Sequence, residues 1–377
     1  GATMIVGGPA KISLTSAWEA TCHEGRLRMR VPPAARGFKL HAPSTEIIDL
    51  GTEFGLEVNG GEAQVEVFEG EIEFRHRDGE KRLVESGAAW KLPHGESESP
   101  AQTGQAQIPN QSDFESQASQ LNQDDFARWT KHRDQLSQDP RLIAYYTFDQ
   151  KGGHVPDLAT LASDNHDGTI VLAEPVDGRW PGFKSALEFR RPGARVRVNI
   201  PGKFEAFTFS AWVRIDSLDR QYSALFLGDG YETGEPHWQI NERGEMMLSV
   251  MVDDSRPNPR AKNGKGFHRV YFSPPMWDMS MSGQWIHLAS IFDPEKANVS
   301  HFVNGEKIHS QTIEKEYLIN QLRIGNGEVG NWGLPFSEDP TWAIRNLNGR
   351  IDEFAIFKQA LTEKEIASLF QNSRVGR

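Results

Sequence analysis

The sequence predicts an all-β chain of two β-domains, joined by a linker and one helix. Three observations lead to this fold class. Apolar and polar residues alternate with a period of two in short runs, turn residues separate these runs, and helical spacing is confined to two segments. At 377 residues the chain is too long for one ordinary core. Its 25% charged and 37% hydrophobic residues are typical of a globular protein.

Residues 4–92 form the first predicted domain. Between Gln64 and Phe74, glutamates alternate with valine, isoleucine and phenylalanine, which indicates half-buried strands. Asn59-Gly60 and Asp78-Gly79 predict hairpin turns, because both of their residues tolerate positive φ.

Residues 93–139 are expected to be a flexible linker followed by a connecting helix. The stretch from His94 to Gln111 is rich in Gly, Ser, Pro, Gln and Glu and has almost no apolar residues. A helix is predicted from Ser112, with Glu115 at capping-box spacing, to the Asp139-Pro140 stop. Its aromatic residues fit packing against a neighbour better than a ligand role.

Residues 140–377 form the second predicted domain, an antiparallel β-sandwich. Strand-like runs from Leu142 onward are separated by turn signals about every 8–12 residues. The segment from Thr362 to Asn372 predicts a helix, which Thr362 and Glu365 open with capping-box spacing.

The second domain resembles the LamG-like, concanavalin A-like jelly-roll family. Several motifs occur in the family's order, and together they cover nearly the whole domain. The segments that carry the resemblance are Ala144–Asp149, Asn165–Thr169, Lys184–Phe189, Phe207–Val213, Gln284–Ala289, His301–Gly305, Leu347–Phe354 and Ala360–Ile366. The resemblance implies a sandwich of two antiparallel sheets that binds a ligand, with its first and last strands side by side.

The first domain resembles FecR, the periplasmic part of transmembrane anti-sigma regulators. Arg28–Pro32 and Gly37–Pro43 precede Asp49–Gly55 and then Val65–Ile72, in the family's order. The pairing with a LamG-like domain resembles large membrane proteins of planctomycete-type bacteria. It implies a periplasmic or cell-surface location, tethered to the inner membrane by a span upstream of Met4. It also implies a sigma factor as partner through a cytoplasmic region. The abrupt start of the strand pattern fits an excised fragment.

Composition excludes several classes of protein. A net charge of −11 argues against nucleic-acid binding, because such an acidic chain has too few cationic side chains to neutralise the phosphates. The single cysteine, Cys22, permits no internal disulfide. No apolar run approaches the roughly 20 residues that a membrane span needs.

The sequence predicts no catalytic activity. Glycoside hydrolases of concanavalin-like fold need two carboxylates on one face. Asp352 and Glu353 are adjacent, so their side chains point to opposite faces of a strand. Glu69, Glu71 and Glu73 do alternate, but they lie in the first domain and fit its solvated face. A glycoside hydrolase-like enzyme is the least favoured alternative.

Calcium is the one cofactor that the resemblance implies. LamG-like domains often hold one ion near the sandwich rim, and Asp149 and Asp352 are the matching candidates as metal ligands. The alternative is that Asp149 caps a turn and Asp352 bonds to backbone. Asp164 and Asp167 form a weaker candidate.

Tryptophans beside Gly, Pro, Asn or His suggest a carbohydrate-binding site. The predicted ligand-binding residues are His237, Trp238, Asn331, Trp332, Trp342 and Arg345. Aromatic rings next to amide and imidazole groups suit stacking on sugars, with hydrogen bonds to hydroxyl groups. The alternative is that these tryptophans pin long loops onto the sandwich. A surface protein is the alternative ligand, with the domain acting in adhesion or as a scaffold.

Overall fold

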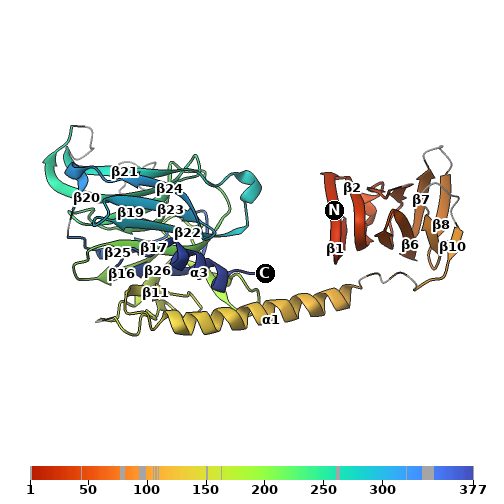
Figure 1. Ribbon diagram of the computed structural model, residues 1–377, viewed down its shortest axis with the longest axis horizontal. Helices are drawn as coiled ribbons and strands as arrows, with labels where there is room; N and C mark the ends of the chain where they lie inside the picture. The colour runs from red at the N-terminus through yellow and green to blue at the C-terminus, as the bar shows by residue number, and fades with distance from the viewer. Residues whose placement is uncertain are drawn as a thin grey trace. The chain divides into compact units, whose positions relative to one another are not determined.

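The computed structural model describes residues 2–43, 45–76, 81–92, 99–104, 106, 108, 110–149, 152–162, 164–259, 264–319, 321–332 and 344–376 (Figure 1). The chain divides into two compact units, residues 1–121 and 122–377. No helix in the described ranges is long and apolar enough to cross a membrane.

The first unit is a ten-stranded sheet in the order β10-β9-β6-β5-β2-β3-β4-β7-β8, with β1 paired to β2. All its strand pairs are antiparallel except β2–β3, which is parallel. The strands are β1 Thr3–Ser16, β2 Glu19–Arg30, β3 Lys39–His41, β4 Thr45–Asp49, β5 Glu53–Asn59, β6 Glu62–Glu69, β7 Glu71–His76, β8 Lys81–Glu85, β9 Ala89–Leu92 and β10 Ser99–Ala101.

The alternation predicted for this unit is confirmed. Val65, Val67, Ile72 and Phe74 are buried in its core, whereas Glu71 is exposed between them. The chain turns between β5 and β6 at Gly60 and Gly61, both at positive φ, where a turn was predicted. The Asp78-Gly79 turn lies outside the described residues.

The second unit is a sandwich of two eight-stranded sheets. Sheet I has the order β14-β15-β26-β17-β22-β23-β24, with β11 paired to β26, and sheet II has the order β12-β13-β16-β25-β18-β19-β20-β21. All of the strand pairs within these two sheets are antiparallel, as predicted for this fold. The β11–β26 pair confirms that the first and last strands lie side by side.

The strands of sheet I are β11 Leu142–Tyr146, β14 Glu174–Asp177, β15 Ser185–Glu188, β17 Phe207–Ile215, β22 Trp285–Asp293, β23 Asn298–Val303, β24 Glu306–Thr312 and β26 Gly349–Phe357. Those of sheet II are β12 His154–Val155, β13 Gly168–Val171, β16 Arg195–Ile200, β18 Tyr222–Gly228, β19 Pro236–Asn241, β20 Glu245–Pro257, β21 Lys265–Pro275 and β25 Gly325–Val329. Short 3-10 turns lie at Pro33–Ala35, Met279–Met281 and Lys315–Tyr317.

Aromatic rings fill the space between the two sheets. Phe209 of sheet I stacks on Phe226 and Trp238 of sheet II, with ring centroids 5.6 Å apart in both pairs. Phe354 stacks on Phe226 at 5.8 Å. These side chains are all fully buried, so this layer is the main source of the hydrophobic stabilisation of the unit.

Two helices have described bounds, α1 (Gln111–Leu136) and α3 (Glu363–Ser373). Within the second unit, the C-terminal half of α1 and α3 pack on the outward face of sheet I. Leu136 of α1 shares an apolar cluster with Ile366 and Leu369 of α3 and with Ala289 and Ala355 of the sheet. Trp129 of α1 is fully buried and stacks on Phe126 at 5.5 Å, so these two aromatic residues of the helix serve packing, as predicted.

The predicted capping box of α3 is present. The Thr362 hydroxyl accepts a hydrogen bond from Glu365 N, and the Glu365 carboxylate accepts one from Thr362 N at 2.8 Å. Replacing Thr362 with alanine is therefore expected to cost about 1 kcal/mol of stability. Chemical denaturation checks this value. Thr362→Ser keeps a hydroxyl at the cap and is the control, and equal losses for both variants would contradict the capping role.

Candidate functional site

The outward face of sheet II carries most of the residues that the sequence singled out. On β19, His237 and Gln239 alternate with Trp238 and Ile240, which belong to the core between the sheets. His237 pairs across the strands with Ser249 of β20, and cross-strand partners share a face. His237, Gln239 and Ser249 therefore share one face of the sheet, where all three residues are at most 6% exposed.

Trp332 is placed over this face by the turn that follows β25. Gly330 has φ +78, and a Cβ there would lie 2.3 Å from a ring carbon of Phe189, so the turn requires glycine. Asn331 then holds the turn, because its side-chain oxygen accepts from Trp332 N at 2.8 Å. The indole Nε1 donates to Gly228 O at 3.1 Å, and the Trp332 ring stays half-buried.

Arg345 lies between two aromatic rings. Its guanidinium carbon is 4.6 Å from the ring centroid of Trp332 and 4.8 Å from that of Tyr222. Its Nη1 donates to Gln239 Oε1 at 3.1 Å. Burial lowers the pKa of Arg345 to about 10, so the side chain stays charged at neutral pH and cation–π attraction holds the three groups together.

His237 joins this group from the sheet. Its Nε2 lies 3.0 Å from Gly228 O, and its ring meets that of Trp332 edge-on at 5.4 Å. Burial, reinforced by the charge of Arg345, lowers the pKa of His237 well below its usual value. The imidazole is therefore neutral at physiological pH. We call Tyr222, Tyr231, His237, Trp332 and Arg345 the aromatic cluster of sheet II.

The structure thus brings four of the six predicted ligand-binding residues together. His237, Trp332 and Arg345 belong to the cluster, and Asn331 supports it by donating from Nδ2 to Ala194 O. Sequence reasoning missed Tyr222 and Tyr231. A signal was present for Tyr231, a lone aromatic residue among the glycines that separate β18 and β19.

The expectation for Trp238 is wrong. Its side chain has no exposed surface and stacks on Phe209 in the core, so it cannot touch a ligand. Trp342 lies outside the described residues.

Asp149 and Asp352 do not fit a calcium site. Asp352 is fully buried, and its Oδ1 lies 2.7 Å from Arg179 Nε and 2.9 Å from Lys184 Nζ. Its Oδ2 accepts from the backbone N of Arg179. A calcium ion would have to displace two buried cations. Asp352 therefore bonds to backbone, as the alternative expected. Asp149 Oδ1 accepts from Ser185 N of β15 at 3.0 Å, which is a bond between distant segments and not the turn cap expected above.

No cluster of three carboxylate, imidazole or thiol side chains suited to a metal ion occurs among the described residues. The weaker candidate, Asp164 and Asp167, stays a prediction, which calorimetric titration with calcium would check.

Asp352 belongs to a buried charged network under α1. Glu353 pairs with Nη2 of the same Arg179, so an irregularity in the β17–β26 pairing brings both carboxylates to one side of the strand and not to opposite faces as predicted. Glu353 also accepts from Tyr145 and, at 3.0 Å, from Trp129 Nε1. Burial alone would raise the pKa of Glu353, but the charges of Arg179 and Lys184 outweigh it and hold the pKa below its usual value. Neither carboxylate is therefore free to act as an acid or nucleophile.

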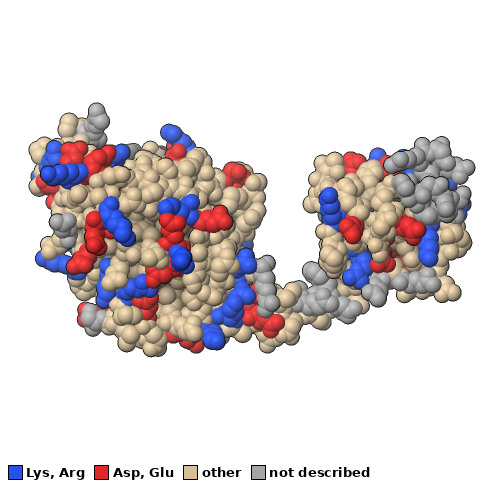
Figure 2. Space-filling model, viewed as in Figure 1, with Lys and Arg blue, Asp and Glu red and all other residues tan. Residues whose placement is uncertain are grey.

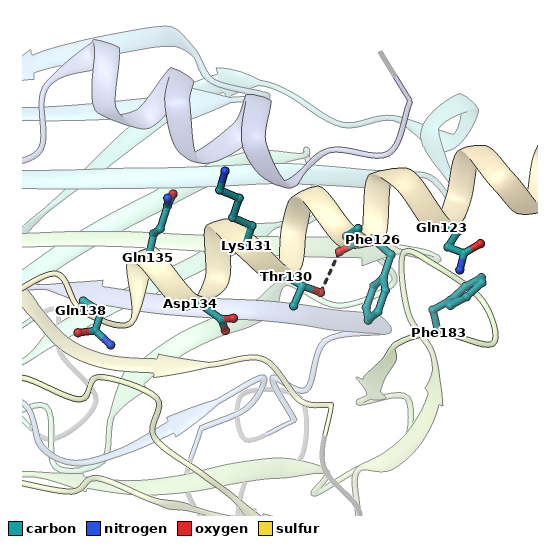
Figure 3. Close-up of a pocket in the computed structure, with 9 residues that line it drawn as sticks. Gln123, Phe126, Thr130, Lys131, Asp134, Gln135, Gln138 and Phe183 are labelled. Atoms are coloured by element: carbon teal, nitrogen blue, oxygen red, sulfur yellow. Dashed lines mark hydrogen bonds between the residues drawn. The ribbon is translucent and has the colours of Figure 1, made fainter.

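Among the described residues of the second unit, two other surface hollows are larger than 300 Å³. One of about 850 Å³ lies beside α1, where the rings of Phe126 and Phe183 are 5.7 Å apart (Figure 3). The other, of about 310 Å³, includes Asp149 and Thr147 in its lining. The polar side chains around the first hollow, such as Gln123 and Gln138, are exposed. They are less fixed than those of the aromatic cluster, which is therefore the better candidate.

Charges of both signs are interspersed on the face of the second unit that Figure 2 shows. The ion pairs of this unit include Arg323 with Glu232 and Lys307 with Glu363. This mixture agrees with the net charge of −11 and differs from the basic stripe of a nucleic-acid-binding surface.

The two units match two protein families. Residues 194–367 match Laminin_G_3, described as the concanavalin A-like lectin/glucanases superfamily, and residues 12–73 match FecR protein. The chain therefore carries a FecR domain followed by a concanavalin A-like domain. Both resemblances drawn from the sequence, and the all-β fold class, are confirmed.

Solved structures give only a weak likeness. The binding domain of Paraclostridial Mosquitocidal Protein 1 is 18% identical, with a TM-score of 0.43, and the match covers 61% of this chain and 52% of that one. The botulinum neurotoxin serotype D binding domain is 14% identical, with a TM-score of 0.44 and coverages of 62% and 52%. The match thus spans about half of each domain, and TM-scores below 0.5 carry no argument about function. No curated protein sequence matches the chain.

Proposed function

We propose that the chain is the extracytoplasmic portion of a membrane-anchored FecR-type regulator or surface protein. Its concanavalin A-like sandwich binds a carbohydrate and does not turn it over. The FecR domain supports the location, because this family consists of membrane-associated periplasmic regulators. The aromatic cluster of sheet II supports the ligand class.

The observation that carries this proposal is the stack of Trp332, Arg345 and Tyr222 on a rigid sheet. A half-buried indole offers an apolar face for the C–H groups of a sugar ring. Gln239 and Arg345 lie beside it as hydrogen-bonding groups for hydroxyls. Strands hold Tyr222 and Gln239, and hydrogen bonds to Gly228 and Gln239 fix Trp332 and Arg345, so binding needs little ordering of these side chains.

The absence of turnover rests on the state of the acidic residues. A glycosidase needs two carboxyl groups about 5–9.5 Å apart across the scissile bond. On β26, Asp352 and Glu353 are buried against Arg179, with Lys184 also paired to Asp352, so they cannot exchange protons with a substrate. We therefore expect no release of reducing sugar from β-glucans or galactans.

In a full-length regulator, sugar capture would report through the FecR domain toward a cytoplasmic sigma factor. We propose clustering as the means, since several chains held on one polysaccharide come close together. Analytical ultracentrifugation with a multivalent ligand tests this part. If a verified multivalent ligand leaves the chain monomeric, the signalling role fails and a tethered binding protein remains.

Replacing Trp332 with alanine is expected to weaken binding to a glycan-array hit by at least about tenfold, because a central aromatic contact is lost. Titration calorimetry of the full chain measures the affinity. Trp18→Ala is the matched control, since Trp18 is 53% exposed in the FecR domain. Tyr222→Ala is a second test that leaves the Trp332 turn intact.

Equal affinity of wild type, Trp332→Ala and Tyr222→Ala would contradict this site. A blank array, together with co-purification of a surface protein, would contradict the carbohydrate proposal in favour of an adhesion or scaffold domain.

A further inference from the structure

Tyr231 covers part of the outward face of sheet II. Its ring lies flat on the imidazole of His237, with centroids 3.7 Å apart and planes 18° apart. It meets His268 edge-on at 5.1 Å, and its hydroxyl donates to Ser249 Oγ at 2.7 Å. One six-membered ring carrying one hydroxyl therefore occupies the surface that these three side chains form.

The backbone at Tyr231 is strained. The residue has φ +47, in the left-handed region, which costs a non-glycine residue on the order of 1 kcal/mol. It lies in the segment from Gly228 to Gly234, which joins β18 to β19 and has a further glycine at position 230. Glycines on both sides allow the segment to move without disturbing the strands.

The ends of the segment are fixed by backbone hydrogen bonds, from Asp229 N to Asn326 O at 2.9 Å and from Gly234 N to Met251 O at 2.8 Å. Glu232 N also donates to the buried Glu235 carboxylate. Between these ends, the side chains of Glu232 and Thr233 are held at the protein surface. Glu232 pairs with Arg323 at 2.8 Å, and their side chains are 53% and 44% exposed. Thr233 Oγ1 donates to Asp254 Oδ1 at 2.9 Å, also in an exposed position. Exposed pairs of this kind contribute about 1 kcal/mol or less. Opening the segment would leave β19 and β20 paired, with His237 and Ser249 in place.

The covered surface continues into the proposed sugar site. His237 contacts Tyr231 through its ring face and Trp332 at an edge, 5.4 Å between centroids. A ligand that reaches past Trp332 on this face would therefore meet Tyr231.

We propose that His237, Ser249 and His268 form a second ring subsite, which Tyr231 covers until a sugar ring of the ligand displaces it. The subsite takes a neutral sugar ring with a hydroxyl, because such a ring repeats the stacking and the hydrogen bond that Tyr231 makes. Burial lowers the pKa of both histidines, so their rings are neutral at physiological pH and offer an uncharged stacking surface. This inference rests on the proposed function, since it extends the same carbohydrate site.

A disulfide lock tests whether Tyr231 must move. Thr233 and Asp254 are replaced by cysteine in the full chain, where the only native cysteine, Cys22, is buried. A panel of β-glucan and galactan oligosaccharides of increasing length serves as probe. Oxidation is expected to weaken binding of the longer members at least about tenfold, and reduction to restore it. Equal binding by the oxidised and reduced forms would overturn the second subsite.

A readout without sugar separates this inference from the proposed function. Carbethoxylation of His237 by diethyl pyrocarbonate, followed by mass spectrometry, reports its accessibility. We expect at least a tenfold faster reaction in Tyr231→Ala than in wild type, and none in the oxidised lock. His154, which is exposed, is the internal control. Equal reaction rates in all three forms would disprove that Tyr231 covers His237. If the rates differ as expected but no sugar binds to the chain, only the carbohydrate function is disproved.

Discussion

Replacing Asp352 with asparagine is expected to lower the free energy of unfolding of the second unit by about 3–5 kcal/mol. The substitution keeps the side-chain volume but removes one of two negative charges that face Arg179 and Lys184. Both cations have no exposed side-chain surface, so water cannot replace the lost partner. Burial already lowers the pKa of Lys184, and Asp352 is the main group opposing that effect.

Urea denaturation followed by tryptophan fluorescence measures this loss, because Trp129 and Trp180 contact the Arg179 side chain. Glu363→Gln is the matched control. Glu363 also pairs with a lysine, at 2.5 Å from Lys307, but its side chain is 64% exposed, so a change within about 1 kcal/mol is expected. A loss below 1 kcal/mol for Asp352→Asn would contradict the structural role of the network and reopen Asp352 as a metal ligand.

Mild acid is expected to destabilise the second unit strongly, through two buried histidines. Burial lowers the pKa of His287 to about 3 and that of His301 to about 4. Both values lie below the ordinary histidine pKa of about 6.5. Between these pKa values, the histidines are protonated in the unfolded chain but not in the folded chain. The stability is therefore complete above about pH 6.5 and declines as the pH falls toward 4. Below about pH 6.5, each histidine lowers the free energy of unfolding by about 1.4 kcal/mol per pH unit. At pH 4.5 the loss is roughly 2–3 kcal/mol for each histidine, relative to neutral pH.

The free energy of unfolding, measured between pH 4.5 and 8, tests this slope. The Nε2 atom of His287 is hydrogen-bonded to the Ser210 hydroxyl, and the Nε2 atom of His301 lies 3.2 Å from Tyr271 O. Glutamine is chosen because its amide keeps a hydrogen-bonding group near the position of Nε2. The double variant His287→Gln/His301→Gln is expected to lose less stability on acidification than wild type, whatever its stability at pH 8. The control is His154→Gln, at an exposed position. Equal slopes in wild type and the double variant would show that these histidines do not govern the acid response.

Local patterns were sufficient to predict most strands and helices, but not β10 (Ser99–Ala101), which lies in the stretch predicted to be a flexible linker. The alternation of valine, isoleucine and phenylalanine in residues 64–74 and the Thr362–Glu365 capping box depend on neighbours in sequence, and both occur as predicted. The pairing of β11 with β26 joins residues more than 200 positions apart. It was expected only because the motifs resembled those of a known family.

The site was predicted less completely. Trp238 lies between His237 and Gln239, and its polar neighbours suggested a loop. The period-two pattern of β19 places Trp238 with Ile240 in the core, so the strand signal was the more reliable one. Asp352 was expected to bind calcium because the family resemblance implied it, and its true partners Arg179 and Lys184 lie 173 and 168 positions away in sequence. Only tertiary structure reveals such a pairing.

The most direct test of the account is a crystal structure of the chain with the tightest-binding oligosaccharide from a glycan array. The account predicts an uncleaved sugar on the outward face of sheet II, stacked on Trp332 and close to Arg345 and Tyr222. An oligosaccharide bound away from this face, or a cleaved product in its place, would contradict the central claim that this face of the sandwich binds carbohydrate without turning it over.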